Sequence, residues 1–327
     1  MKLVSKDAVP FRWCFIGTGT LAKQVAKQIL KSGRHEIVSV YTRREESAAE
    51  FTEKFGGYYY GSAREAMAAD DVDAVYIVTT HDSHYEYAKL ALELGKPVLV
   101  EKPITMTAEQ AKDLQKLAKK KGLYIAEAMW TWFSPVAHQV KDWLDTGAYG
   151  DLKKFRISYC MNSKGYADRV TDPNKAGGAL LDVGVYPVHY VYRLFGMPEK
   201  ITCEGKLKNG VDLADTIVMD YGNGRRIKFR ASVDDFRGFE KLLIKGTEAR
   251  TDLLLWHMAN RAVLKRPIGH KTTRGRCDYL NEFDIVADEI QLGYTESRYV
   301  PIQASVDVMI LLDKCRKDMK LKYPFEK

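Results

Sequence analysis

Continuous apolar runs alternate with amphipathic segments through the first part of the chain, and this pattern constrains the fold more than any other feature. The runs at 72–80 and 97–102 are apolar along most of their length, whereas 21–33 repeats apolar residues with a helical period. Apolar strands separated by amphipathic helices are typical of a parallel sheet covered on both faces. The sequence therefore predicts an α/β fold that begins with a doubly wound parallel Rossmann sheet over residues 1–128.

The same pattern sets the individual elements of this half. Strands are expected over 12–17, 35–42, 57–61, 72–80, 97–102 and 123–129, with helices over 21–33, 47–56, 62–69, 83–95 and 107–122. Ligands of such sheets bind at the carboxyl ends of the strands, so the loops there are the first candidates for a site.

After Met129 the pattern changes to shorter, alternating stretches. Strands are expected over 153–161, 200–207, 214–222, 225–233 and 240–246, and helices over 178–196, 279–293 and about 303–320. This arrangement predicts a second, α+β domain over residues 129–327 with a large, mostly antiparallel open sheet. We expect the C-terminal helix to pack back on the first domain.

Composition and charge exclude several classes of protein. The formal net charge is +8, but the basic residues are spread along the chain with acids beside them, so nucleic acid is not an expected partner. No window approaches the ~20 apolar residues of a membrane helix. The N-terminal residues lack the apolar core of a signal peptide, so a cytoplasmic location is expected.

The cysteines are isolated and lack the spacing of a zinc site, and they are interpreted as buried small side chains in a reducing compartment. They are Cys14, Cys160, Cys203, Cys277 and Cys315.

A glycine-rich loop directly follows the first predicted strand and precedes a helix. In a dinucleotide site the first glycine makes the tight turn, the second lets the backbone approach a pyrophosphate, and the helix N-terminus favours the anion. The residues expected to form this loop are Gly17, Thr18, Gly19, Thr20 and Leu21.

The end of the second predicted strand indicates which dinucleotide binds. An NAD site usually has an acid there, but this chain has Thr42, Arg43 and Arg44, a hydroxyl and two guanidinium groups that suit a 2′-phosphate. The alternative is that the arginines are solvated and paired with Glu45 and Glu46. The sequence favours NADP(H), with NAD possible.

Lys102 lies where another apolar strand ends, next to a proline that stops the strand. A cation there can polarise a substrate oxygen and lower the pKa of a neighbouring proton donor. Glu101 either orients Lys102 or holds part of the cofactor. Taken alone, the stretch also fits an ordinary surface ion pair beside a turn.

A later helical segment places Asp182, Tyr186 and His189 at i, i+4 and i+7, on one face of an otherwise apolar helix. Such a polar stripe is expensive to bury unless it lines a cavity. Tyr186 can exchange a proton with a substrate hydroxyl, and Asp182 can bind a second hydroxyl or accept from Lys102. His189 is interpreted as a structural histidine.

The motifs GTGTLA, EKP and GGALLDVGVYPVHY occur in one chain in this order, and with them the sequence resembles the glucose-fructose oxidoreductase / inositol dehydrogenase / MocA (Gfo/Idh/MocA) family. The segments HDSHYEYAKLALELGKPVLVEKPITMTAEQA, EAMWTWFSP and EFDIVADEIQLGYTES extend the resemblance over nearly the whole chain. The most similar branch is that of dimeric dihydrodiol dehydrogenase and NADP-dependent D-xylose 1-dehydrogenase.

The resemblance implies roles for particular residues. Lys102 matches the family's catalytic lysine, and Asp182 and Tyr186 match its Asp-x-x-x-Tyr pair, with the tyrosine as general acid/base. Cofactor contacts are implied for Thr79, His81, His84, Glu101, Lys102 and Arg169, the last with the substrate as an alternative. Trp132 replaces an arginine of this branch, which implies altered specificity or a different pocket wall.

These observations predict an NADP(H)-dependent oxidoreductase that transfers hydride between nicotinamide and a sugar, polyol or vicinal-diol substrate. The family's open sheet implies a homodimer or higher homo-oligomer. Two alternatives stay open: a non-catalytic NAD(P)-binding sensor, and an enzyme with tightly bound, recycled NAD(P). A metal enzyme built on His81 and His84 is disfavoured because no third ligand is evident.

Overall fold

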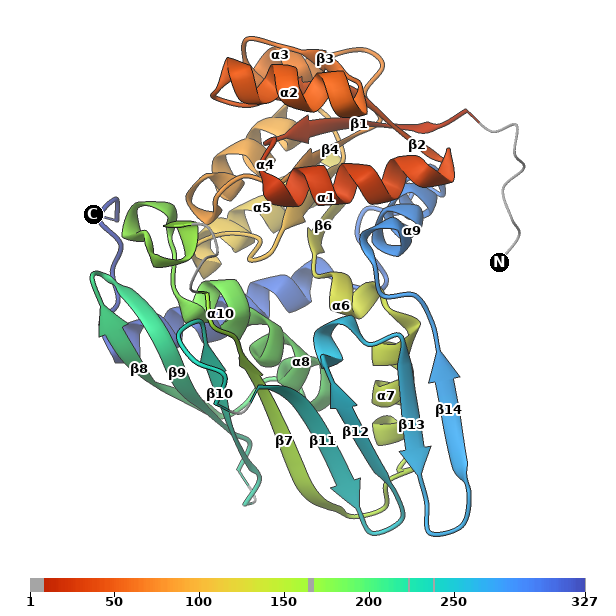
Figure 1. The fold of residues 1–327 in the computed structure, drawn as a ribbon, viewed down its shortest axis with the longest axis vertical. Helices are drawn as coiled ribbons and strands as arrows, with labels where there is room; N and C mark the ends of the chain where they lie inside the picture. Colours follow the sequence, from red (N-terminus) through yellow and green to blue (C-terminus); the bar gives the residue numbers. More distant parts are fainter. Residues whose placement is uncertain (1–8, 164–167, 223, 238, 327) are drawn as a thin grey trace.

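Two sheets and the helices that flank them make up the computed structural model, which describes residues 9–163, 168–222, 224–237 and 239–326 (Figure 1). The first sheet is six-stranded within these residues and has the order β3-β2-β1-β4-β5-β6, with every pair parallel. Its strands are β1 (Phe11–Ile16), β2 (His35–Tyr41), β3 (Tyr58–Tyr59), β4 (Ala74–Ile77), β5 (Val98–Glu101) and β6 (Ile125–Ala128). The predicted doubly wound parallel sheet is confirmed, and its strand order reverses between β1 and β4, where ligands bind.

Helices connect these strands, and their ends follow ordinary capping chemistry. They are α1 (Thr20–Ile29), α2 (Glu45–Phe55), α3 (Ala63–Ala68), α4 (His84–Glu93) and α5 (Ala108–Lys121). For α5, the Thr107 side chain accepts from the Gln110 N–H at the start, and Gly122 ends the helix in a left-handed conformation.

The second sheet has eight strands in the described residues, in the order β14-β13-β12-β11-β7-β10-β9-β8. All neighbours are antiparallel except β7 and β10, so the predicted, mostly antiparallel sheet is confirmed. Its strands are β7 (Leu152–Cys160), β8 (Lys200–Lys208), β9 (Val211–Asp220), β10 (Arg226–Ser232), β11 (Glu240–Gly246), β12 (Arg250–Leu254), β13 (Arg261–Lys265) and β14 (His270–Arg274). The strands β12 to β14 are absent from the sequence prediction.

Helices cover one face of this sheet. They include α6 (Trp130–Phe133), α7 (Pro135–Asp145) and α8 (Val185–Phe195), and a π-helical turn (Leu180–Gly184) leads into α8. Along β7, Phe155 packs on Phe195 of α8 with ring centroids 5.1 Å apart, whereas its neighbours Lys154 and Arg156 are exposed. The two faces of the sheet therefore differ, one apolar under helices and one polar and basic.

The helix α9 (Tyr279–Gln291) follows the second sheet in sequence but packs on the first half. It contacts α1, and its Phe283 ring lies 4.6 Å from the Trp13 ring of β1. Arg34 forms ion pairs with Asp284 and Asp288 at 2.9 and 2.6 Å. The sequence prediction placed this helix with the second sheet.

The last helix, α10 (Ile302–Met319), runs between the two sheets and contacts α5, α8 and β8 (Figure 1). Ser305 donates to the Glu127 carboxylate at 2.6 Å, and Asp313 accepts from the Ala108 N–H at 2.8 Å. These bonds tie the end of the chain to β6 and to the start of α5. Among the described residues, no helix has both the length and the apolar character needed to cross a bilayer.

Candidate active site

The loop between β1 and α1 has the geometry of a phosphate cradle. Gly17 has φ +109°, and a Cβ there would lie 2.6 Å from the Val78 carbonyl oxygen, so only glycine fits. Gly19 caps α1 with ordinary extended backbone, and a Cβ there would meet nothing within 4 Å. The space beside Gly19 is the place where an anion can approach the helix N-terminus.

A cavity of about 320 Å³ opens at this loop. The residues that line it are Thr18, Gly19, Thr20, Lys23, Arg44, Glu46, Ser47 and Glu50. The buried Thr18 hydroxyl lies 2.7 Å from the Ser47 hydroxyl, and Thr20 and Leu21 begin α1. These features fit the phosphates and ribose of a dinucleotide.

Arg43 and Arg44 are exposed, and within the described residues neither lies within 4 Å of a carboxylate. Arg44 lines the cavity, whereas Arg43 and the half-buried Thr42 lie next to it in sequence without lining it. The structure therefore does not show the alternative arrangement, in which Glu45 and Glu46 form ion pairs with the two arginines.

A compact charge cluster forms where β5 ends. The Lys102 Nζ donates to the Asp182 carbonyl oxygen at 2.7 Å and lies 3.3 Å from its carboxylate, which Arg169 also contacts at 3.0 Å. Burial alone would raise the pKa of Asp182, but the charges of Lys102 and Arg169 outweigh it and hold that pKa well below its usual value. The structure thus brings together three of the predicted site residues.

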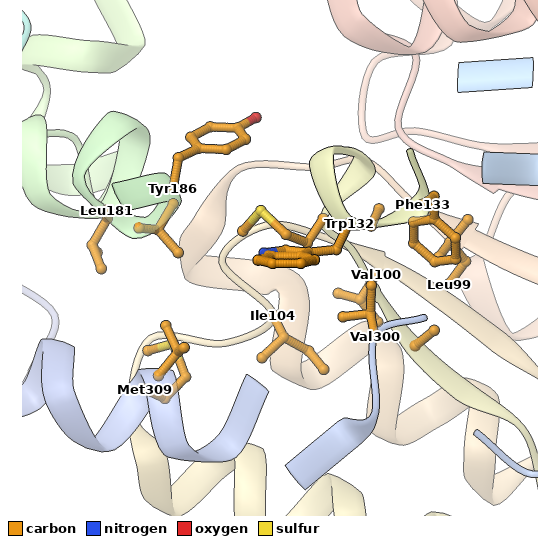
Figure 2. Close-up of a cluster of buried hydrophobic side chains, with 14 of the residues drawn as sticks. Leu99, Val100, Ile104, Trp132, Phe133, Leu181, Tyr186, Val300 and Met309 are labelled. Atoms are coloured by element: carbon orange, nitrogen blue, oxygen red, sulfur yellow. The ribbon is translucent and has the colours of Figure 1, made fainter. Parts of the chain in front are cut away.

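Tyr186 lies against this cluster. The Lys102 Nζ is 5.0 Å from the centroid of its ring, and in Figure 2 the ring points away from the apolar side chains around it, with the hydroxyl outermost. Burial raises the pKa of Tyr186 well above its ordinary value, and nearby tyrosines and carboxylates add to the shift. We expected Lys102 to lower this pKa. In the structure burial dominates, and Tyr186 is a protonated donor.

Glu101 points into the protein rather than toward the Lys102 ammonium group. Its carboxylate accepts from the Tyr76 hydroxyl at 2.7 Å and from the Lys102 main-chain N–H at 3.3 Å. Burial raises its pKa despite these bonds. It braces the end of β5 next to Lys102.

Thr79, His81 and His84 lie in the loop after β4, beside Lys102. His81 lies 3.1 Å from the Ala176 carbonyl oxygen through Nδ1, and its Nε2 is 3.5 Å from Arg169. His84 contacts the carbonyl oxygens of Pro103 at 2.8 Å and Thr79 at 3.3 Å.

Burial lowers the pKa of both His81 and His84, so their rings are neutral. In the part of the chain that the structure describes, no group of three metal-ligating side chains occurs.

Trp132 lies elsewhere than the sequence implied, and His189 lies in the core beside it. Trp132 is fully buried, with the Arg193 guanidinium 4.4 Å from its ring, so it forms core rather than a wall of the site (Figure 2). His189 is also fully buried, 3.9 Å from Glu127 and beside Trp132, and its ring nitrogens have no hydrogen-bond partner in the described residues. His189 therefore lies in the core, as expected of a structural histidine, and does not join Asp182 and Tyr186.

The sequence reasoning missed an aromatic wall beside Tyr186. His257 and Tyr159 lie 5.4 and 5.5 Å from the Tyr186 ring, and Trp130 stacks on Tyr279 with ring centroids 4.8 Å apart. Trp130 also lies 5.4 Å from His257. These residues come from four separate segments, so no local motif marks them.

Comparisons with known proteins identify the family of the chain. Residues 11–128 match the model described as oxidoreductase family, NAD-binding Rossmann fold, and residues 137–251 match the GFO/IDH/MocA C-terminal domain. The trans-1,2-dihydrobenzene-1,2-diol dehydrogenase of Oryctolagus cuniculus is 31% identical over 316 residues, which cover 92% of this chain and 95% of that protein. The D-xylose 1-dehydrogenase (NADP(+)) of Hypocrea jecorina is 34% identical over 213 residues, 58% of this chain and 54% of that protein.

A solved structure shows the same fold. The 3-ketoreductase from Actinomadura kijaniata, in complex with NADP and TDP-benzene, superposes with a TM-score of 0.84 at 24% identity and covers 95% of this chain and 98% of its own. The chain therefore belongs to the Gfo/Idh/MocA oxidoreductase family, as its motifs predict, and its first half is a nicotinamide dinucleotide-binding Rossmann domain.

Proposed function

We propose that the protein is an NADP(H)-dependent dehydrogenase that acts on a CH–OH group of a vicinal diol, sugar or polyol. One observation carries this proposal: Lys102, Asp182 and Tyr186 form one cluster at the same edge of the sheet as the Gly17–Gly19 loop. A dinucleotide anchored at that loop extends along the carboxyl ends of the strands toward this cluster. The names of the diol and xylose dehydrogenases support the substrate class.

The residues supply proton transfer and charge. When bound, the nicotinamide supplies or accepts the hydride at the reacting carbon. In the reductive direction the protonated Tyr186 donates its proton to the carbonyl oxygen as that carbon gains hydride, and in oxidation the phenolate takes the proton back. Lys102 places a positive charge beside this oxygen, and Asp182 holds both Lys102 and Arg169 in position.

The choice of NADP rests on Arg43 and Arg44, which are exposed and have no carboxylate partner in the described residues. A 2′-phosphate dianion forms charge-assisted bonds with two guanidinium groups, whereas a ribose hydroxyl gains little from them. The relative from Hypocrea jecorina is named for NADP(+).

A substrate panel tests this function. Aldoses, inositols and trans-diols are offered with NADP⁺ and with NAD⁺, and reduced cofactor is followed by absorbance, with Tyr186→Phe run in parallel. We expect NADP⁺-dependent oxidation of at least one class by the wild type and none by the variant. Cofactor binding without turnover on any compound would instead identify a sensor.

We also propose a homodimer in the cytoplasm, with the polar face of the second sheet as the contact between copies. On this face, four basic side chains form one row of cross-strand neighbours that runs over β7, β11, β12 and β13. They are Lys154, Lys245, Arg250 and Lys265. Like charges in one row repel, so we expect light scattering to show a dimer that tightens as salt is added. A monomer at every salt concentration would contradict the proposal. The described cysteines are free and buried, which supports a reducing compartment.

A further inference from the structure

A buried carboxylate–imidazole pair forms part of the wall beside Tyr186. The Glu240 carboxylate accepts from the His257 Nδ1 at 2.5 Å and from the His257 main-chain N–H at 3.0 Å. Both side chains are almost fully buried, at 4% and 9% exposure. A polar pair costs free energy to bury, so its place next to the proton donor needs a reason.

The hydrogen bonds fix which way the imidazole faces. The contact with the carboxylate places a proton on Nδ1 of His257, and in the ring that carries only this proton Nε2 is the acceptor. This Nε2 lies 3.4 Å from the Tyr159 hydroxyl, which is longer than an ordinary hydrogen bond.

The imidazole packs directly beside Tyr186. Its ring stacks on Tyr159 with centroids 4.8 Å apart and meets the Tyr186 ring edge-on at 5.4 Å. Lys102 approaches the same Tyr186 ring at 5.0 Å. The Tyr186 ring therefore has both Lys102 and His257 as neighbours, so these two groups can contact neighbouring oxygens of one substrate.

We propose that His257, held by Glu240, binds the hydroxyl on the carbon next to the one that exchanges hydride. This subsite selects vicinal diols over simple alcohols, and it rests on the proposed function in placing the reacting carbon at Tyr186. The neighbouring hydroxyl of the diol donates a hydrogen bond to Nε2. An alcohol that lacks this hydroxyl cannot form that bond. His257 is a substrate-binding residue in this scheme, and Glu240 a positioning residue.

Other contacts hold the backbone here, so the ring can be changed separately. The His257 carbonyl oxygen accepts from the Thr131 hydroxyl at 2.7 Å, and this bond does not involve the imidazole. The amide of an asparagine takes the place of Nδ1 and keeps the bond to Glu240, whereas the amide of a glutamine takes the place of Nε2. The variants His257→Asn and His257→Gln thus form a matched pair.

The test compares the vicinal trans-diol of cyclohexane with cyclohexanol as substrates with NADP⁺. We expect His257→Asn to lower kcat/KM for the diol about 10- to 100-fold more than for cyclohexanol, with partial recovery of the diol preference in His257→Gln. Glu240→Gln should lower diol oxidation through a raised KM. His138→Asn, at a half-buried histidine on α7, serves as the matched control.

Equal losses on both alcohols, or an unchanged preference for the diol in His257→Asn, would overturn the proposal. If the wild type oxidises neither alcohol, the wider substrate panel decides the proposed function, and the subsite is judged separately by binding. Fluorescence of Trp130, stacked on Tyr279 beside His257, reports the Kd of each alcohol in the NADP⁺ complex. Tighter binding of the diol that disappears in His257→Asn supports the subsite, and equal binding of the two alcohols rejects it.

Discussion

The Lys102 ammonium group lies 2.7 Å from the carbonyl oxygen of Asp182 and 3.3 Å from its carboxylate. Lys102 directly follows strand β5 of the first sheet, and Asp182 lies in a π-helical turn at the second sheet. The two halves of the protein thus meet through this charge pair, at the point where the proposed chemistry needs a cation. Removing either charge leaves the other buried with less compensation.

Loss of the Tyr186 hydroxyl or of the Lys102 ammonium group should remove turnover but not cofactor binding. We expect Tyr186→Phe and Lys102→Ala to lower kcat about 100- to 10,000-fold, the range for a positioned proton donor. Phenylalanine keeps the ring contacts with Tyr159 and His257. NADPH titration by fluorescence checks that binding persists, and near-normal kcat in either variant would refute the assigned roles.

The two glycines of the phosphate loop should respond differently to alanine. At Gly17 the positive φ and the nearby Val78 carbonyl oxygen make any Cβ strained, so Gly17→Ala should lower the free energy of unfolding by about 1–3 kcal/mol. Gly19→Ala meets no protein atom within 4 Å, so it should fold normally and lose NADPH affinity instead. Thermal melts and NADPH titrations of both variants separate the effects, and equal melting temperatures for the two would contradict this reading.

Removing the guanidinium groups should change the choice of cofactor. Arg43→Ala and Arg44→Ala should each lower kcat/KM for NADP⁺ about 10- to 100-fold and leave the value for NAD⁺ nearly unchanged. Glu46, which lines the same cavity, should have the opposite effect, because Glu46→Gln removes a charge that repels the phosphate. An NAD⁺ preference in the wild type that survives Arg43→Ala would exclude the NADP assignment.

Glu127 should make stability depend on pH. Burial raises its pKa from 4.5 to about 7, so the folded state holds a proton that the unfolded state has lost between these values. Stability from this group therefore falls as pH rises from about 4.5 to about 7, by up to about 3 kcal/mol, and stays constant above.

The neutral variant Glu127→Gln isolates this effect. Its amide still bonds to Ser305 and to the Ile104 N–H, the partners of the carboxylate, without ionising. The unfolding free energy of the variant relative to the wild type should rise between pH 5 and pH 8, as measured by denaturant titration. A difference that does not change with pH would show that Glu127 is ionised at low pH in the folded protein.

Most of the first half could be predicted because its strands are buried on both faces. The stretch 97–102 reads as one apolar run, and the structure has β5 there at Val98–Glu101. By contrast, β14 (His270–Arg274) is exposed at nearly every position, so it has no alternation to detect. The docking of α9 was equally hidden, because Phe283 marks an apolar face but not the surface that covers it.

The candidate site shows the same limit. Lys102 and Asp182 belong to motifs whose local pattern is unusual, a charge at a strand end and a polar residue in an apolar helix. His257 lies in an apolar stretch of sequence. The orientation of its imidazole ring is set by the hydrogen bond to Glu240, which is 17 residues earlier in the chain. The sequence shows that Trp132 replaces an arginine of the related branch, but it does not show which way the tryptophan side chain turns. For this reason Trp132 was wrongly expected in the wall of the pocket.

Helices α9 and α10 follow the second sheet in the sequence but contact the first half of the protein. This arrangement limits where chimeras of such proteins can be joined. The bridge between Ile125 and Glu296 and the Ser305–Glu127 bond make the C-terminal segment part of the framework that holds β6. The substrate half is in this sense an insertion within a discontinuous cofactor half. A chimera with a new substrate half therefore needs two crossover points, one after β6 and one before α9, because a single cut would strip the Rossmann sheet of two of its own covering helices.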